Sequence, residues 1–85
     1  MSKEVLRKAI HEGIKNMKYH AYRSPFNLEK RLASIKQEER YLQGFICALM
    51  YAHVISSEEF FQYSDWILKK ALKYNSYSID SYYHI

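Results

Sequence analysis

Histidine and cysteine are the residues of this chain that could ligate a metal or act as a nucleophile, and there are few of them. The one cysteine, Cys47, lies in an apolar segment without a neighbouring base, which indicates a buried and unreactive thiol. His53 lies where a helix is expected to end, and its charge would suit the helix dipole there. The histidines are scattered without the spacing of a zinc motif, at His11, His20, His53 and His84. We expect no metal site and no cofactor.

Paired carboxylates could perform acid–base chemistry, but the two pairs here are adjacent in sequence. Neighbouring residues of a helix point about 100° apart, so neither Glu38–Glu39 nor Glu58–Glu59 converges on one site. Ser56 is explained by helix capping, and the two glycines are isolated, so no phosphate-binding loop is formed. We therefore expect a protein that is not an enzyme.

The formal net charge of +4 is unevenly distributed along the 85 residues. Residues 1–36 carry a net charge of +6, residues 37–66 carry −4 and residues 67–85 carry +2. The basic first third can attract nucleic acid or an acidic protein. Alternatively, it can meet the acidic middle of the same fold or of a second copy.

Nucleic-acid binding is the second candidate function, with the basic residues contacting phosphates. Glu4 and Glu12 dilute the basic face of the first helix, and such faces are usually only solvated. A helix-turn-helix interpretation is disfavoured because Glu58 and Glu59 would repel the DNA backbone. The residues of this candidate are Arg7, Lys8, Lys15, Lys18, Arg23, Lys30 and Arg31.

Trp66 is the most specific indication of protein binding. It falls outside the apolar stripe of its helix, among Gln62, Lys70 and Lys73. A large aromatic side chain among long polar ones is typical of an interaction hot spot. The alternative is that the tyrosine-rich carboxyl-terminal segment covers Trp66.

Three helices are expected to position these residues, at residues 3–22, 25–53 and 57–74. The first has Leu6, Ile10, Ile14, Met17 and Ala21 at helical spacing, a possible cap at Ser2, and Gly13 where another helix can approach. The second starts near Pro25 or Leu28, with Ser24 or Asn27 as cap, and its inner face holds Leu28, Leu32, Ile35 and Leu42. Residues 45–54 are apolar nearly all round, which predicts the centre of the core, a self-association surface, or both.

The start of the third helix has the clearest local signal. Ser56 and Glu59 have the spacing of a capping box, and Ile55 and Phe60 that of a hydrophobic staple. The inner face is expected to hold Phe60, Tyr63, Ile67, Leu68 and Ala71. Residues 75–85 lack a helical period, so we expect an irregular tail that folds back on the helices or docks on another chain.

These elements predict an all-α, three-helix antiparallel bundle forming a single domain over residues 1–85, with completion by homodimerisation as an alternative. No segment approaches the roughly 20 apolar residues that span a bilayer. The charged start resembles no signal peptide, and a lone thiol fits a reducing compartment. We expect a cytoplasmic protein that does not bind membranes.

Residues 49–60, LMYAHVISSEEF, resemble the helical hairpin of short bacterial and phage domains that share an Ile-Ser/Thr-x-Glu-Glu-Phe phrase between helices. The chain departs from them with His53, near where a glycine often ends the first helix. Its size, basic charge and Tyr/Lys-rich composition also resemble small accessory proteins of phages and prophages. This resemblance implies an inhibitor or regulator that engages a host or phage protein.

We therefore expect a non-enzymatic, protein-binding accessory or regulatory factor, with homo-oligomerisation and nucleic-acid binding as alternatives. The expected contact residues belong to the basic face of the first helix and to the Trp66 region with the tail. They are Arg7, Lys8, Lys15, Lys18, Trp66, Lys70, Lys73, Tyr77, Tyr82 and Tyr83.

Overall fold

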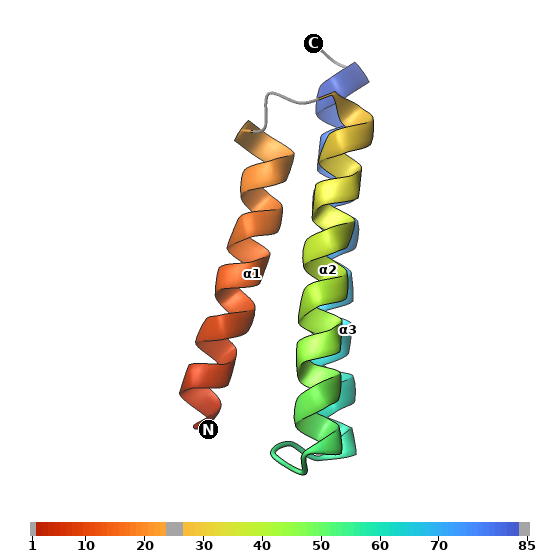
Figure 1. Ribbon diagram of the computed structural model, residues 1–85. Helices are drawn as coiled ribbons and strands as arrows, with labels where there is room; N and C mark the ends of the chain where they lie inside the picture. Colours follow the sequence, from red (N-terminus) through yellow and green to blue (C-terminus); the bar gives the residue numbers. More distant parts are fainter. Residues whose placement is uncertain (1, 24–26, 84–85) are drawn as a thin grey trace.

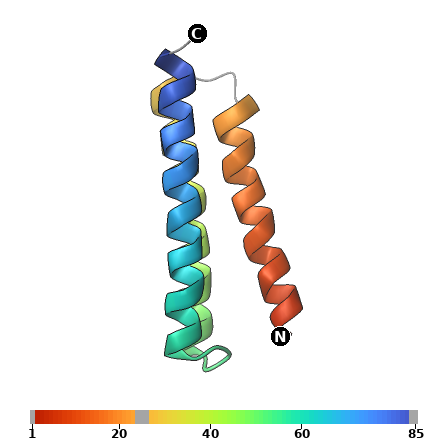
Figure 2. The ribbon, with the colours of Figure 1, turned by 180° about the vertical axis from the view of Figure 1, so that it is seen from behind.

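A computed structural model describes residues 2–23 and 27–83, which form the helices α1 (Lys3–Arg23), α2 (Leu28–Tyr51) and α3 (Ser57–Tyr83). The helices run up, down and up along a bundle whose Cα atoms extend over 46 × 18 × 15 Å (Figure 1). Every helix contacts the other two, and the reverse view shows α1 beside the α2–α3 hairpin (Figure 2). The predicted all-α, three-helix fold is confirmed. No described helix is long and apolar enough to cross a membrane.

Side-chain caps begin all three helices where the sequence predicts them. The Val5 N–H donates to Ser2 Oγ at 3.2 Å, and the Lys30 N–H donates to Asn27 Oδ1 at 3.0 Å. Asn27 is therefore the cap of α2, whereas the alternative at Ser24 and the predicted start at Pro25 lie outside the described residues.

The predicted capping box of α3 forms in both directions. The Glu59 N–H donates to Ser56 Oγ at 3.1 Å, and the Ser56 N–H donates to Glu59 Oε1 at 3.1 Å. The two staple residues also pack inward, since Ile55 is buried and Phe60 is packed against the core. These contacts fix the direction in which α3 leaves the turn.

The end of α2 is a left-handed turn at His53, two residues after the last helical residue, Tyr51. His53 has a φ of 60°, a region that usually favours glycine. Its N–H donates to the Met50 carbonyl at 3.0 Å, and the Val54 N–H donates to the Leu49 carbonyl at 2.9 Å. This pair of hydrogen bonds is a Schellman motif, which satisfies carbonyls that the helix end would leave free.

The core lies along the bundle axis, and all the predicted inner residues of α1 are buried in it. Gly13 lets α2 come close, because a Cβ there would lie 2.6 Å from the Leu42 methyl carbons. The predicted inner face of α2 is buried only at Ile35 and Leu42, while Leu28 and Leu32 are half-buried. The buried apolar residues are Leu6, Ile10, Ile14, Met17, Ala21, Ile35, Leu42, Ile46, Ile55, Tyr63, Ile67, Ala71 and Tyr74.

The predicted irregular tail is wrong for residues 75–83, which continue α3 to Tyr83. Tyr74 and Ser78 extend the inner face of α3 by two more turns, and both are buried. Ser78 is tolerated there because its hydroxyl donates to the Tyr74 carbonyl at 2.9 Å. Residues 84 and 85 of the predicted tail lie outside the described residues.

Residues 45–54 are not enclosed by helices as one of the two interpretations predicted. Only Ile46 among them is buried, while Phe45, Leu49 and Met50 pack partly against the core. Tyr51 is 76% exposed, because two neighbouring helices cover only one sector of α2. Leu68 is a related correction: it was expected on the inner face of α3 but is 44% exposed.

Candidate partner-binding surface

The seam between the parallel helices α1 and α3 has a constant register over its whole length. Lys3 pairs with Glu59 at 3.5 Å, the His11 ring meets Trp66 edge-on at 4.8 Å, and Tyr22 stacks on Tyr77 at 3.8 Å. In each pair the α3 residue lies 55 or 56 positions further along the chain. Equal spacing follows because parallel helices rise by the same distance per residue.

This register brings the two surfaces predicted separately from the sequence onto one face of the bundle. Arg7 and Lys18 share with His11 and Tyr22 the side of α1 that meets α3, since all fall within about 60° around the helix. Lys70 and Lys73 follow Trp66 by one and two turns on α3. We call this set the basic–aromatic seam, defined as Arg7, Lys18 and Tyr22 of α1 with Trp66, Lys70, Lys73 and Tyr77 of α3.

The cations of the seam form no salt bridge with a described acidic residue. Within residues 2–23 and 27–83, salt bridges join Lys3 to Glu59 and Lys69 to Asp65. No described carboxylate forms a salt bridge with Arg7, Lys18, Lys70 or Lys73. Glu4 and Glu59 lie on the same face at its amino-terminal end, so the unpaired positive charge is concentrated from Arg7 onward. A seam with this potential attracts an acidic surface.

Aromatic contacts hold several side chains of the seam in place. Trp66 is half-buried against the core and touches His11. The Lys18 ammonium lies 5.8 Å from the Tyr22 ring centre, and the Lys73 ammonium lies 5.7 Å from that of Tyr74. Such cation–π contacts favour one placement of a long side chain, and they leave the charge accessible.

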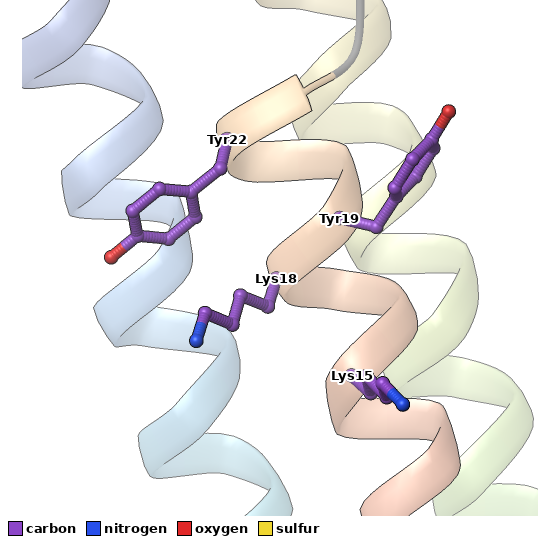
Figure 3. Close-up of a pocket in the computed structure, with 4 residues that line it drawn as sticks. All are labelled: Lys15, Lys18, Tyr19 and Tyr22. Atoms are coloured by element: carbon purple, nitrogen blue, oxygen red, sulfur yellow. The ribbon is translucent and has the colours of Figure 1, made fainter.

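A shallow hollow lies at the carboxyl-terminal end of α1, lined by Lys15, Lys18, Tyr19 and Tyr22. Lys18 and Tyr22 extend toward α3, whereas Tyr19 extends toward α2 (Figure 3). Lys15 points outward between them (Figure 3). The hollow therefore borders the seam and adds a further cation, Lys15, beside it.

Two residues of the predicted contact set lie apart from the seam. Tyr82 and Tyr83 lie about 140° and 120° around α3 from Tyr77, and they contact each other edge-on at 5.3 Å. Lys8 is exposed and, like Lys15, borders the seam, because it lies about 20° around α1 from Lys15 and about 40° from Tyr22. The structure therefore groups eight of the predicted residues, counting Lys8 and Lys15, and separates these two.

Trp66 does not lie under residues 75–83, the described part of the segment that the alternative placed over it. Residues 75–83 continue α3 away from Trp66, so they do not fold back over it. Sequence reasoning also missed two participants, Tyr22 and the ring contact of His11. The spacing of Lys18 and Tyr22, four residues apart on one helix, is the signal that could have indicated Tyr22.

The predicted nucleic-acid set is divided between helices. Arg7, Lys8, Lys15 and Lys18 belong to α1, while Lys30 and Arg31 belong to the first turn of α2. Arg23 ends α1, but its side chain lies outside the described part of the structure. The set therefore does not form one continuous strip along a single helix.

The candidates for nucleophilic or metal chemistry are dispersed. Cys47, expected to be buried, is half-buried, and His53 is exposed at the turn after α2. Among the residues described, no three histidine, cysteine or acidic side chains are grouped so that they could hold a metal ion. Searches of protein-family models, of curated proteins and of solved structures find no match to this chain.

Proposed function

We propose that the protein is a non-enzymatic binding protein whose basic–aromatic seam engages an acidic surface of another protein. The observation that supports this most strongly is the convergence of two helices on one face. Cations from α1 and α3 lie along the same face as a half-buried tryptophan, Trp66, and form no salt bridge among the described residues. Such a site combines electrostatic steering with an aromatic anchor.

The aromatic contacts favour a protein partner over a single-stranded nucleic acid. Base stacking needs a free aromatic face. Tyr22 and Tyr77 use one face each on the other, with planes 19° apart, and Trp66 receives the His11 ring. The remaining exposed part of Trp66 suits a contact with an apolar group at the centre of an acidic patch.

Preorganisation supports an accessory or inhibitory role, as the resemblance to phage accessory proteins implies. Lys18 and Lys73 are held near aromatic rings, so binding would order fewer side chains. A small bundle that covers an acidic patch of its partner can prevent other molecules from binding to that patch.

Nucleic-acid binding through the same cations is the second candidate, because phosphates also respond to a row of positive charges. The structural feature that favours it is the addition of Lys15 beside Lys18 in the hollow of α1. The two candidates differ in their aromatic component, since phosphate binding does not need Trp66.

The experiment compares two variants of equal net charge. Lys18→Gln/Lys73→Gln removes two seam cations, and Lys36→Gln/Arg40→Gln removes two exposed cations of α2 outside the seam. Proteins captured from lysate by the wild type should be lost with the seam variant and with Trp66→Ala, but kept with the α2 variant. Equal capture by all variants would contradict the proposal.

A salt titration with random-sequence duplex DNA separates the second candidate. Phosphate binding should weaken steeply as salt rises between about 50 and 200 mM. It should also be insensitive to Trp66→Ala. Tight, strongly salt-dependent binding of this kind would promote the nucleic-acid function over the protein-binding one.

A further inference from the structure

A second apolar stripe runs along α3, on the side away from α1. Phe61, Leu68, Leu72 and Ile79 are 68%, 44%, 56% and 40% exposed. At about 100° per residue they fall within a sector of about 40°, roughly 120° from the core-facing Ile67. We call these four residues the apolar stripe. Four large apolar side chains aligned on one helix are more than scattered surface exposure.

The spacing of the apolar stripe is the same when counted from either end. Its intervals are seven, four and seven residues, so residue 70 lies at its centre. If two copies of α3 pack antiparallel about this centre, Phe61 of each copy meets Ile79 of the other. Leu68 of each copy then meets Leu72 of the other.

This palindromic spacing favours a second copy of the chain as the occupant of the stripe. A two-fold symmetric interface requires that if residue i contacts residue j, then j also contacts i. The four residues meet this condition in one register, so a second copy of α3 can cover the stripe of the first and have its own stripe covered in turn. We propose that the apolar stripe is the interface of an antiparallel homodimer formed by α3 and α3 of a second copy.

The polar neighbours of the stripe are compatible with this register. Asp65 and Asn75 flank the stripe on its two sides, each about 40° from its centre, so neither lies within it. Lys69, near the dimer axis, is already paired with Asp65 of its own helix at 2.8 Å. The stripe itself contains no charged residue, and it spans about 27 Å of helix.

The homodimer would leave the basic–aromatic seam accessible. Trp66 and Leu68 lie about 160° apart around α3, so the dimer would present one seam on each outer side. This proposal does not depend on the proposed function. If the chain dimerises but captures no acidic protein, only the homodimer proposal is supported. If the chain is monomeric but captures an acidic protein, only the proposed function of the seam is supported.

Sedimentation equilibrium tests whether the stripe mediates association. The wild type should be a dimer that dissociates on dilution, and Leu68→Gln/Leu72→Gln should weaken it by at least tenfold. The control is Tyr41→Gln/Tyr51→Gln. It removes two aromatic residues of α2 that are 69% and 76% exposed, and therefore more exposed than Leu68 and Leu72. It should leave the dimer unchanged. Circular dichroism establishes that each variant is folded.

Disulfide trapping tests the register in a Cys47→Ser background. A mixture of Phe61→Cys and Ile79→Cys chains should form a cross-linked dimer, because these positions meet in the antiparallel arrangement. Phe61→Cys alone should not cross-link to itself, since its two copies would lie about 27 Å apart along the axis.

Two results would overturn the proposal. One is a wild-type chain that remains monomeric at every concentration tested. This result would overturn the proposal even if the stripe were found to bind a different protein. The other is efficient self-cross-linking of Phe61→Cys, which would mean that the helices pair in parallel.

Discussion

Tyr22 of α1 stacks on Tyr77 of α3 with ring centres 3.8 Å apart and planes 19° apart. Tyr22 also meets Tyr74 edge-on at 6.1 Å. These contacts connect the end of α1 to the last three turns of α3, the part of the chain expected to be irregular. They also close the upper end of the basic–aromatic seam, where Tyr22 extends toward α3 (Figure 3).

Tyr77→Ala should destabilise the protein and loosen the end of α3. Loss of a stacked aromatic pair removes about 0.5–1.5 kcal/mol beyond the buried area, so we expect a total near 2 kcal/mol. Urea unfolding measures the free energy, and hydrogen exchange at residues 78–83 measures the local loosening. Tyr83→Ala, at a position 71% exposed, is the control and should change little. Similar losses in both variants would show that the stack does not hold the helix.

The continuation of α3 shows what limited the fold prediction. Helix caps depend on residues close in sequence, so the cap at Ser56 could be predicted, and Asn27 could be named as one of two alternatives. The helix over residues 75–83 depends on Tyr22, which is more than 50 residues away, and on an internal hydrogen bond of Ser78. Serines and an asparagine favour turns by propensity, and here tertiary packing overrides that preference.

Gly13 and Gly44 should respond oppositely to alanine. At Gly13 a methyl group would lie 2.6 Å from Leu42, and overpacking of this kind costs about 1–3 kcal/mol. This exceeds the gain of about 1 kcal/mol in helix propensity, so Gly13→Ala should destabilise. Gly44 has open space, and Gly44→Ala should stabilise by about 0.5–1 kcal/mol. Stabilisation by both substitutions in thermal unfolding would disprove the close contact of α1 with α2.

Replacing His53 by glycine should stabilise the protein. The φ of 60° costs an L-residue about 1 kcal/mol that glycine does not pay. The expected gain in the free energy of unfolding is therefore about 0.5–1 kcal/mol. His53→Ala removes the imidazole but keeps the Cβ, so it should give no gain. If alanine stabilised as much as glycine, the imidazole itself and not the backbone would be unfavourable.

The capping box at Glu59 should make stability depend on pH. The Ser56 N–H and, next, the nearby Lys3 ammonium lower the pKa of Glu59 below its usual value. A lowered folded-state pKa contributes stability above the unfolded pKa, and this contribution is lost as the pH falls through the folded pKa. The advantage of the wild type over Glu59→Gln should therefore shrink on acidification below about pH 4.5. Glu58→Gln removes the same charge outside the capping box and is the control for urea titrations at each pH.

The candidate surface was predictable residue by residue but not as an arrangement. Spacing indicated that Trp66 lies outside the apolar stripe of its helix and that Lys18 belongs to a basic helix face. The contact of His11 with Trp66 depends on the register in which the parallel helices α1 and α3 pack. That register is set by the packing of all three helices and cannot be predicted from the sequence of one helix. The apolar stripe was missed because Leu68 was assigned to the inner face, although it follows Ile67 by one residue and therefore points about 100° away from it.

Site-specific photo-cross-linking in cells tests the central claim most directly. A photoreactive amino acid replaces Gln62, which is exposed one turn before Trp66, or, in a separate variant, Tyr41 on α2, which is 69% exposed. The account predicts a discrete cross-link from position 62 to a protein with an acidic surface, abolished by Trp66→Ala, and none from position 41. Cross-links from position 41 with none from position 62, or cross-links from position 62 to nucleic acid alone, would contradict it.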